Sequence, residues 1–203
     1  MNRIQYIREN RADVFRSMPN IFLPYGLSTN NGSPPLTIRR RKLMMLHPEK
    51  GWIDEMKTRM VCVQAAGCAP ITEAWEKKEK KSMMWDESDT VAFGMNVPKS
   101  KGDFMVLDSL YSSGGYATSV DDDEILRTKQ IITKEEGLFA CPEGSSAVAG
   151  IKKLLDQGLI DRNEKVVVVN TGSGLKYPNT VQTSMPLLQP GDEIQIELEE
   201  STE

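Results

Sequence analysis

The sequence predicts an α/β fold with a mostly parallel sheet and flanking helices, and two stretches carry this prediction. Residues 166–169 are four consecutive valines, which is typical of a strand buried on both faces of a parallel sheet. Residues 138–158 begin with a short apolar strand at 138–141 and continue through the turn Pro142-Glu143-Gly144 into a helix at 145–158. Strand, helix and strand in this order predict a right-handed crossover.

Other short apolar segments supply the remaining elements. Strands are expected at residues 18–26, 60–65, 90–94 and 116–120, and helices at residues 70–81, 102–111 and 121–137. The last helix has the clearest limits, because Asp121 followed by Glu124 is an N-cap pattern and Gly137 is a typical C-terminal stop. A helix N-terminus favours negative charge, so we attribute the acidic run at 121–124 to the helix and assign no metal site.

Charge divides the chain into three parts. Residues 1–50 contain nine Lys or Arg against three acids, whereas the residues after Lys176 contain six acids and no base. We expect a divergent, partly disordered segment at 1–50, an α/β domain at 51–180 and an acidic tail at 181–203. The net charge of −4 argues against a nucleic-acid partner, and the basic cluster at 39–42 lacks interleaved aromatic residues.

The cysteines indicate a reducing compartment. Cys62, Cys68 and Cys141 are too few and wrongly spaced for a disulfide framework or a zinc site, and the single histidine, His47, is distant in sequence. We expect free thiols and a cytoplasmic protein. No apolar run approaches the roughly 20 residues of a membrane span, so no membrane partner is expected.

The candidate site lies directly after the valine run. Residues 170–174 read Asn-Thr-Gly-Ser-Gly, which places hydroxyl groups and permissive backbone at the carboxyl end of a predicted strand. Open α/β sheets bind their ligands at that edge, so we expect the chemistry there.

Several motifs in register resemble the C-terminal portion of threonine synthase, a fold type II enzyme dependent on pyridoxal 5′-phosphate. They are Cys-Pro-Glu-Gly-Ser-Ser-Ala-Val-Ala-Gly from Cys141, Asn-Thr-Gly-Ser-Gly-Leu-Lys-Tyr from Asn170, Gly-Trp-Ile-Asp from Gly51, Met-Val-Cys-Val-Gln-Ala-Ala-Gly-Cys-Ala-Pro-Ile from Met60 and Val-Pro-Lys-Ser-Lys-Gly-Asp-Phe from Val97. The resemblance covers about residues 51–177 and implies the same fold for them.

The resemblance also implies a cofactor, a reaction and site residues. Thr171 matches the hydroxyl residue that meets the pyridine nitrogen of pyridoxal 5′-phosphate, and a neutral hydroxyl leaves that nitrogen unprotonated. Glu143 and Gly144 match the turn at the edge of the cofactor pocket, where they would shape its surroundings. The implied activity is that of a lyase that converts O-phosphohomoserine to threonine and phosphate.

The sequence departs from this family at its N-terminal end. The lysine that forms the Schiff base belongs to a half that this chain lacks, so we assign no catalytic residue. The expected phosphate loop, at residues 26–33, has only two glycines, and one hypothesis is that residues 27–50 are read out of frame.

We therefore expect an incomplete enzyme, which would act with further copies of itself or with a complementary N-terminal chain. Two alternatives stay open. One is a non-catalytic remnant or binding module of the same fold, and the other is a related enzyme such as cysteate synthase.

Overall fold

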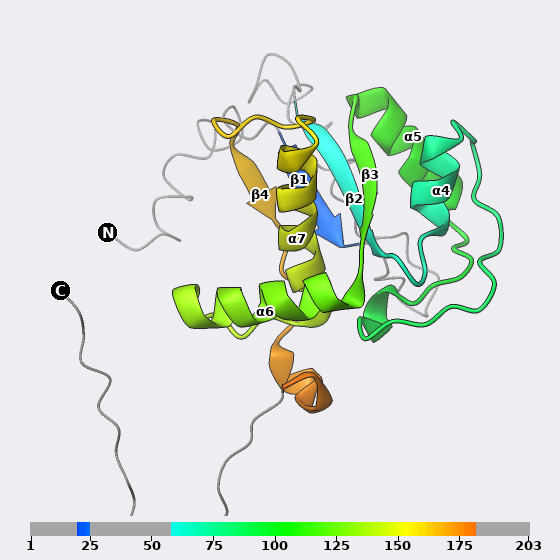
Figure 1. Ribbon diagram of the computed structural model, residues 1–203. Helices are drawn as coiled ribbons and strands as arrows, with labels where there is room; N and C mark the ends of the chain where they lie inside the picture. Colours follow the sequence, from blue (N-terminus) through cyan, green and yellow to red (C-terminus); the bar gives the residue numbers. More distant parts are fainter. Residues whose placement is uncertain (1–19, 25–57, 182–203) are drawn as a thin grey trace, which may run out of the picture.

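The computed structural model describes residues 20–24 and 58–181 (Figure 1). The basic cluster at 39–42, the loop at 26–33 and almost all of the expected acidic tail lie outside these residues. The described part contains a four-stranded sheet, in which every pairing is parallel and the order is β3-β2-β1-β4. The strands are β1 (Asn20–Pro24), β2 (Arg59–Ala65), β3 (Tyr116–Val120) and β4 (Val166–Val168). The predicted α/β class with a parallel sheet is confirmed.

Strand β1 occupies an interior position in this sheet. Asn20 pairs with Arg59 of β2 on one side and with Val166 of β4 on the other. The sheet thus includes a strand from residues 1–50 as well as three strands from residues 51–180, and β4 joins it only through β1.

Helices cover both faces of the sheet, as a buried parallel sheet requires. They are α4 (Pro70–Glu76), α5 (Asp103–Ser113), α6 (Asp122–Glu136) and α7 (Pro142–Asp156), with short 3₁₀ helices η1 (Phe93–Met95), η2 (Gly174–Lys176) and η3 (Pro178–Thr180). Helices α4 and α5 lie on one side of the sheet, whereas α7 crosses the other side with α6 near its lower end (Figure 1).

The side chains of β2 alternate between two cores, because successive residues of a strand point to opposite faces. Met60 and Cys62 belong to the core formed with α4 and α5. Val61 and Val63 belong to the core formed with α7. This strand is almost completely buried, and the sheet therefore separates two apolar cores, one on each of its faces.

Helix α6 shows why some limits follow directly from sequence. The side chain of Asp121 accepts a hydrogen bond of 2.7 Å from the backbone N–H of Glu124, and Gly137 ends the helix with a left-handed φ of 62°. Both features were expected from the residue types, since Asp caps helix N-termini and Gly tolerates positive φ. The expected N-cap and stop are confirmed.

Two predicted strands and the predicted crossover are wrong. Residues 90–94 form no strand, and Phe93–Met95 is a 3₁₀ helix. Residues 138–141 form only an isolated antiparallel bridge between Ala140 and Ser173. A short apolar run does not reveal whether a neighbouring strand is available to pair with it. The crossover from 138–141 through α7 to β4 is accordingly not formed.

Some element limits and the burial of one strand also differ. Helix α4 ends at Glu76 instead of residue 81, and α7 begins at Pro142 instead of residue 145. Proline suits the first turn of a helix, because the missing N–H has no partner there in any case. Strand β4 is half-buried and lies at the edge of the described sheet, not buried on both faces as its valines predict. No helix in residues 58–181 is both long and apolar enough to cross a bilayer.

Candidate functional site at the carboxyl edge of the sheet

Three segments meet beyond the carboxyl ends of the strands. They are the first turn of α7, residues 170–177 after β4, and η1. In Figure 1 they gather at the lower end of the sheet, toward which the arrows of β1 and β4 point. This is the edge at which parallel α/β sheets bind ligands.

Backbone hydrogen bonds hold the strand-end loop against the start of α7. The N–H of Cys141 donates to the carbonyl of Gly172 at 3.2 Å, and the N–H of Gly174 donates to the carbonyl of Phe139 at 2.9 Å. Residues 139–141 and 172–174 thus run side by side although they are far apart in sequence. Their pairing brings Thr171 next to the N-terminus of α7.

Cys141 occupies the centre of this arrangement. Its thiol accepts a hydrogen bond from the N–H of Gly144 at 3.4 Å and so caps α7. The sulfur also lies 3.8 Å from the hydroxyl oxygen of Thr171 and 3.7 Å from Oδ1 of Asn170. Burial raises the pKa of the Cys141 thiol, and the N–H of Gly144 and the hydroxyl of Thr171 oppose that change. The thiol is therefore protonated at neutral pH, and this uncharged side chain packs between the Thr171 loop and the first turn of α7.

Gly144 is required by a close approach of two segments. A Cβ atom on this residue would lie 2.0 Å from Oδ1 of Asn170 and 3.4 Å from its Cα. No side chain fits at that separation, so glycine allows the strand-end loop to pack directly on the first turn of α7.

Glu143, in the first turn of α7, links η1 to the segment after β4. Its side chain is 4% exposed, and Oε1 accepts hydrogen bonds from the N–H of Gly94 at 2.8 Å and from the phenolic O–H of Tyr177. Burial and the adjacent Glu143 carboxylate raise the pKa of Tyr177 above its usual value. A buried carboxylate is stable only when donors surround it, and here the donors come from η1 and from the segment after β4.

The structure brings together the three residues expected from sequence. Thr171 and Gly144 both contact Cys141, and Glu143 is the neighbour of Gly144. One detail is corrected, since Glu143 and Gly144 lie in the first turn of a helix and not in a turn before it. The position of Thr171 after β4 agrees with the expected strand-end loop.

Sequence reasoning missed the partners of Glu143. Gly94 was expected to end a strand, and Tyr177 was only part of a motif. Their link to Glu143 spans 49 and 34 residues, and no local pattern marks contacts at such separations. The burial of Glu143, which would have called for donors, is itself visible only in the folded chain.

The residues present fit the ring-nitrogen end of a pyridoxal 5′-phosphate cofactor. Thr171 is a half-buried residue, and its hydroxyl makes a long contact of 3.8 Å with the Cys141 thiol. It therefore keeps the capacity to donate to a ligand. The Glu143 carboxylate already accepts hydrogen bonds from two donors of the protein. It is therefore not needed as a partner for a ring nitrogen, which agrees with a nitrogen that carries no proton. The expected phosphate segment, residues 26–33, lies outside the described residues.

The fold and this site define the class of protein. The chain belongs to the family described as pyridoxal-phosphate dependent enzymes, whose sequence profile matches residues 43–172. Comparison with individual curated proteins identifies relatives of one kind within this family. The chain is 40% identical over 129 residues to threonine synthase from Methanocaldococcus jannaschii, an alignment that covers 64% of this chain and 32% of that protein. It is 31% identical over 167 residues to threonine synthase from Methanosarcina acetivorans, which covers 82% of this chain and 40% of the relative.

Solved structures show the same fold. The processed form of threonine deaminase isoform 2 from Solanum lycopersicum matches with a TM-score of 0.60 at 16% identity, over 89% of this chain and 48% of that one. The chain spans less than half the length of these relatives.

Proposed function

We propose that this chain supplies one side of a pyridoxal 5′-phosphate site in a threonine synthase-like lyase, which converts O-phosphohomoserine to threonine and phosphate. The observation that carries the proposal is the position of Thr171, a half-buried residue whose hydroxyl lies beside the first turn of α7 at the carboxyl edge of a parallel sheet. The two relatives described above, both threonine synthases, support the choice of reaction.

Thr171 would hold the cofactor through its ring nitrogen. Its hydroxyl donates one hydrogen bond, and the nitrogen then remains unprotonated. A carboxylate at this position would instead hold a proton on the nitrogen, so the residue type sets the strength of the electron sink. When bound, the cofactor supplies that electron sink for bond cleavage in an amino-acid substrate.

The neighbouring residues would position Thr171. Cys141 separates the Thr171 loop from α7, and Gly144 lets Asn170 pack against the helix. Glu143 fixes η1 and the segment after β4 to the same helix turn. Together they hold the hydroxyl in place before a ligand arrives, which lowers the entropic cost of binding.

Neither the covalent lysine nor the phosphate contacts are assigned to the described residues. These groups are to be sought in the rest of the chain, in another copy or in a separate partner chain. A complete lyase needs all of them together, because the lysine moves the proton and backbone N–H groups hold the phosphate.

Binding of pyridoxal 5′-phosphate to the purified full chain tests the proposal. We expect Thr171→Val to weaken binding about fivefold and to shift the absorption band, because one hydrogen bond is worth about 1 kcal/mol. Thr171→Ser keeps the hydroxyl and should bind as the parent does. Thr133→Val is a matched control, since the Thr133 hydroxyl bonds to the carbonyl of Lys129 within α6.

Two outcomes would count against it. Equal affinity and an unchanged spectrum for Thr171→Val would remove Thr171 from the site. Borohydride reduction that fixes the cofactor stably on one lysine among residues 58–181 would contradict the absence of a covalent lysine from the described part.

A further inference from the structure

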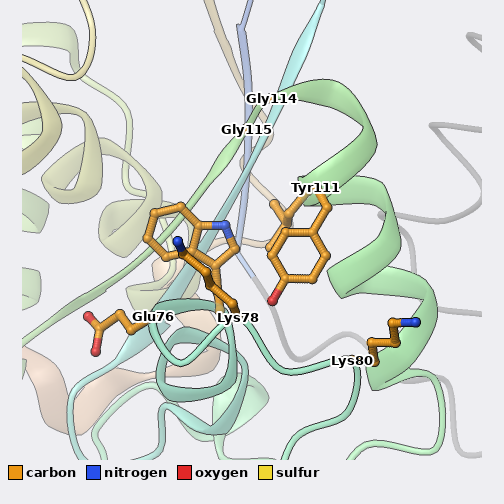
Figure 2. A pocket seen from close by; sticks show the side chains of 8 residues that line it. Glu76, Lys78, Lys80, Tyr111, Gly114 and Gly115 are labelled. Atoms are coloured by element: carbon orange, nitrogen blue, oxygen red, sulfur yellow. The ribbon is translucent and has the colours of Figure 1, made fainter.

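A second hollow lies at the opposite edge of the sheet from the Thr171 site. It is a groove of about 560 Å³ between the carboxyl ends of α4 and α5, within the range of small-molecule sites. Gly114 and Gly115, which lie directly before β3, form part of its lining (Figure 2). Since the Thr171 loop is at the carboxyl edge of the strands, this groove is independent of the function proposed above.

Two aromatic rings form its apolar surface. Trp75 packs edge-to-face on Tyr116, with ring centroids 6.1 Å apart and planes at 70°. The Tyr111 hydroxyl donates to the carbonyl of Glu79 at 2.7 Å and so fixes the second ring. Both Trp75 and Tyr111 line the groove. The rings are held in place by the protein and offer a flat ligand a pre-formed stacking surface.

Two lysines give the groove its charge. Lys78 and Lys80 line it together with a single acid, Glu76. Neither lysine forms an ion pair within the described residues, whereas the neighbouring Lys77 pairs with Glu73. With Glu76 as the one acid among the lining residues, the groove has an excess of one positive charge, and Lys80 extends away from Lys78 on the far side of Tyr111 (Figure 2).

The backbone at Lys78 provides an independent observation. This residue has a left-handed φ of 57° directly after the end of α4, a position where glycine is the usual residue. A lysine in this conformation costs stability. Strain of this kind clusters at functional sites, where the gain is in the placement of a side chain. In Figure 2 the Lys78 side chain extends over the groove.

We propose that this groove binds a small anionic ligand that carries a flat ring. The ring stacks on Trp75 and Tyr111 beside the backbone of Gly114 and Gly115, the acidic group pairs with Lys78, and Lys80 adds positive charge on the far side of Tyr111. Charge complementarity selects the anion over a neutral or cationic analogue with the same ring.

A matched pair of probes tests both elements. Indole-3-acetate and tryptamine share a ring system and carry opposite charges. Amide chemical shifts of Gly114 and Gly115 in the full chain report binding inside the groove, and we expect them to move with indole-3-acetate and not with tryptamine. The response to indole-3-acetate should weaken as salt is raised, since the lysines are exposed.

Lysine variants complete the test and leave the aromatic packing intact. The double variant Lys78→Gln/Lys80→Gln should weaken indole-3-acetate binding about tenfold. Lys81→Gln removes the same kind of charge just outside the groove and should leave binding unchanged. Equal binding of both probes, no shift at Gly114 and Gly115, or an equal loss in Lys81→Gln would each overturn the proposal.

Discussion

The carboxylate of Glu143 accepts a hydrogen bond from the phenolic O–H of Tyr177, and this contact ties the first turn of α7 to the segment that follows Thr171. The same Oε1 atom accepts from the N–H of Gly94. One buried carboxylate therefore determines how three chain segments meet at the carboxyl edge of the sheet. Removing any one of its contacts should loosen all three.

Replacing Tyr177 with Phe tests this link. The variant leaves Glu143 with one fewer donor, so we expect a loss of about 1–2 kcal/mol in the free energy of unfolding near neutral pH. Chemical denaturation measures it. A variant as stable as the parent would show that the Tyr177 hydroxyl contributes nothing to the site.

The same variant should change the dependence of stability on pH. The pKa of Tyr177 is raised in the folded chain, so its stabilising contribution is complete below about pH 10 and falls as the pH rises above that value. We expect the parent to lose more stability than Tyr177→Phe between about pH 9 and about pH 11. Parallel losses in the two proteins would contradict the raised pKa.

Gly144 and Asn170 should behave as a coupled pair. Gly144→Ala places a methyl group 2.0 Å from Oδ1 of Asn170, and such overpacking typically costs about 1–3 kcal/mol. In an Asn170→Ala background the clash with Oδ1 is gone, so the same substitution should cost less. A double-mutant cycle measured by denaturation gives the coupling. Strict additivity would show that the two residues do not collide.

Asp103 should stabilise the protein above acidic pH. Burial alone would raise the pKa of Asp103, but hydrogen bonds from Lys99, Ser82 and Phe104 hold it below its usual value. The Ser82 N–H and hydroxyl donate at 2.9 and 2.8 Å, and the Lys99 ammonium lies 2.7 Å away. The stability from these contacts is present above about pH 4 and is lost as the pH falls through the lowered pKa.

The corresponding variant is Asp103→Asn. It should cost about 2–3 kcal/mol near neutral pH, because hydrogen bonds to a charged group are the stronger kind. The difference from the parent should shrink as the pH falls below about 4. Unfolding curves at several pH values check this, and a constant difference at all pH values would be inconsistent with it.

Lys78→Gly should stabilise the chain although it deletes a side chain. Lys78 has a φ of 57°, which costs an L-residue roughly 1–2 kcal/mol, and the greater freedom of glycine when unfolded offsets part of the gain. We expect a net gain of up to about 1 kcal/mol by thermal or chemical unfolding. Lys77→Gly is the control, because Lys77 has an ordinary helical φ of −76° and should lose stability. A loss in both variants would show that no strain is stored at Lys78.

Sequence predicted well those elements whose limits depend on neighbouring residues. The N-cap of α6 at Asp121 and its end at Gly137 follow from residue type alone. Strand β2 was clear because residues 60–65 form a nearly continuous apolar run. The errors arose where the outcome depends on distant residues. The valines of β4 predict burial on both faces, but that strand lies at the edge of the described sheet, and an apolar pattern does not identify neighbours.

The candidate site divides in the same way. Thr171, Glu143 and Gly144 were found because each belongs to a continuous motif that resembles a known family. The role of Asn170 against Gly144, and those of Gly94 and Tyr177 around Glu143, depend on contacts between segments that only the folded chain brings together. The local amino-acid sequence does not reveal such contacts.

The interior position of β1 also constrains how the protein can assemble. Asn20 pairs with Arg59 and with Val166, so β4 can join the sheet only after nearly the whole described chain has left the ribosome. Closing so long a loop is entropically costly, and folds with many distant pairings form slowly. Until β4 arrives, β1 exposes an unpaired parallel edge that can recruit other chains. We therefore expect the Thr171 loop, which follows β4, to be among the last parts to be ordered, and aggregation during synthesis to compete with its formation.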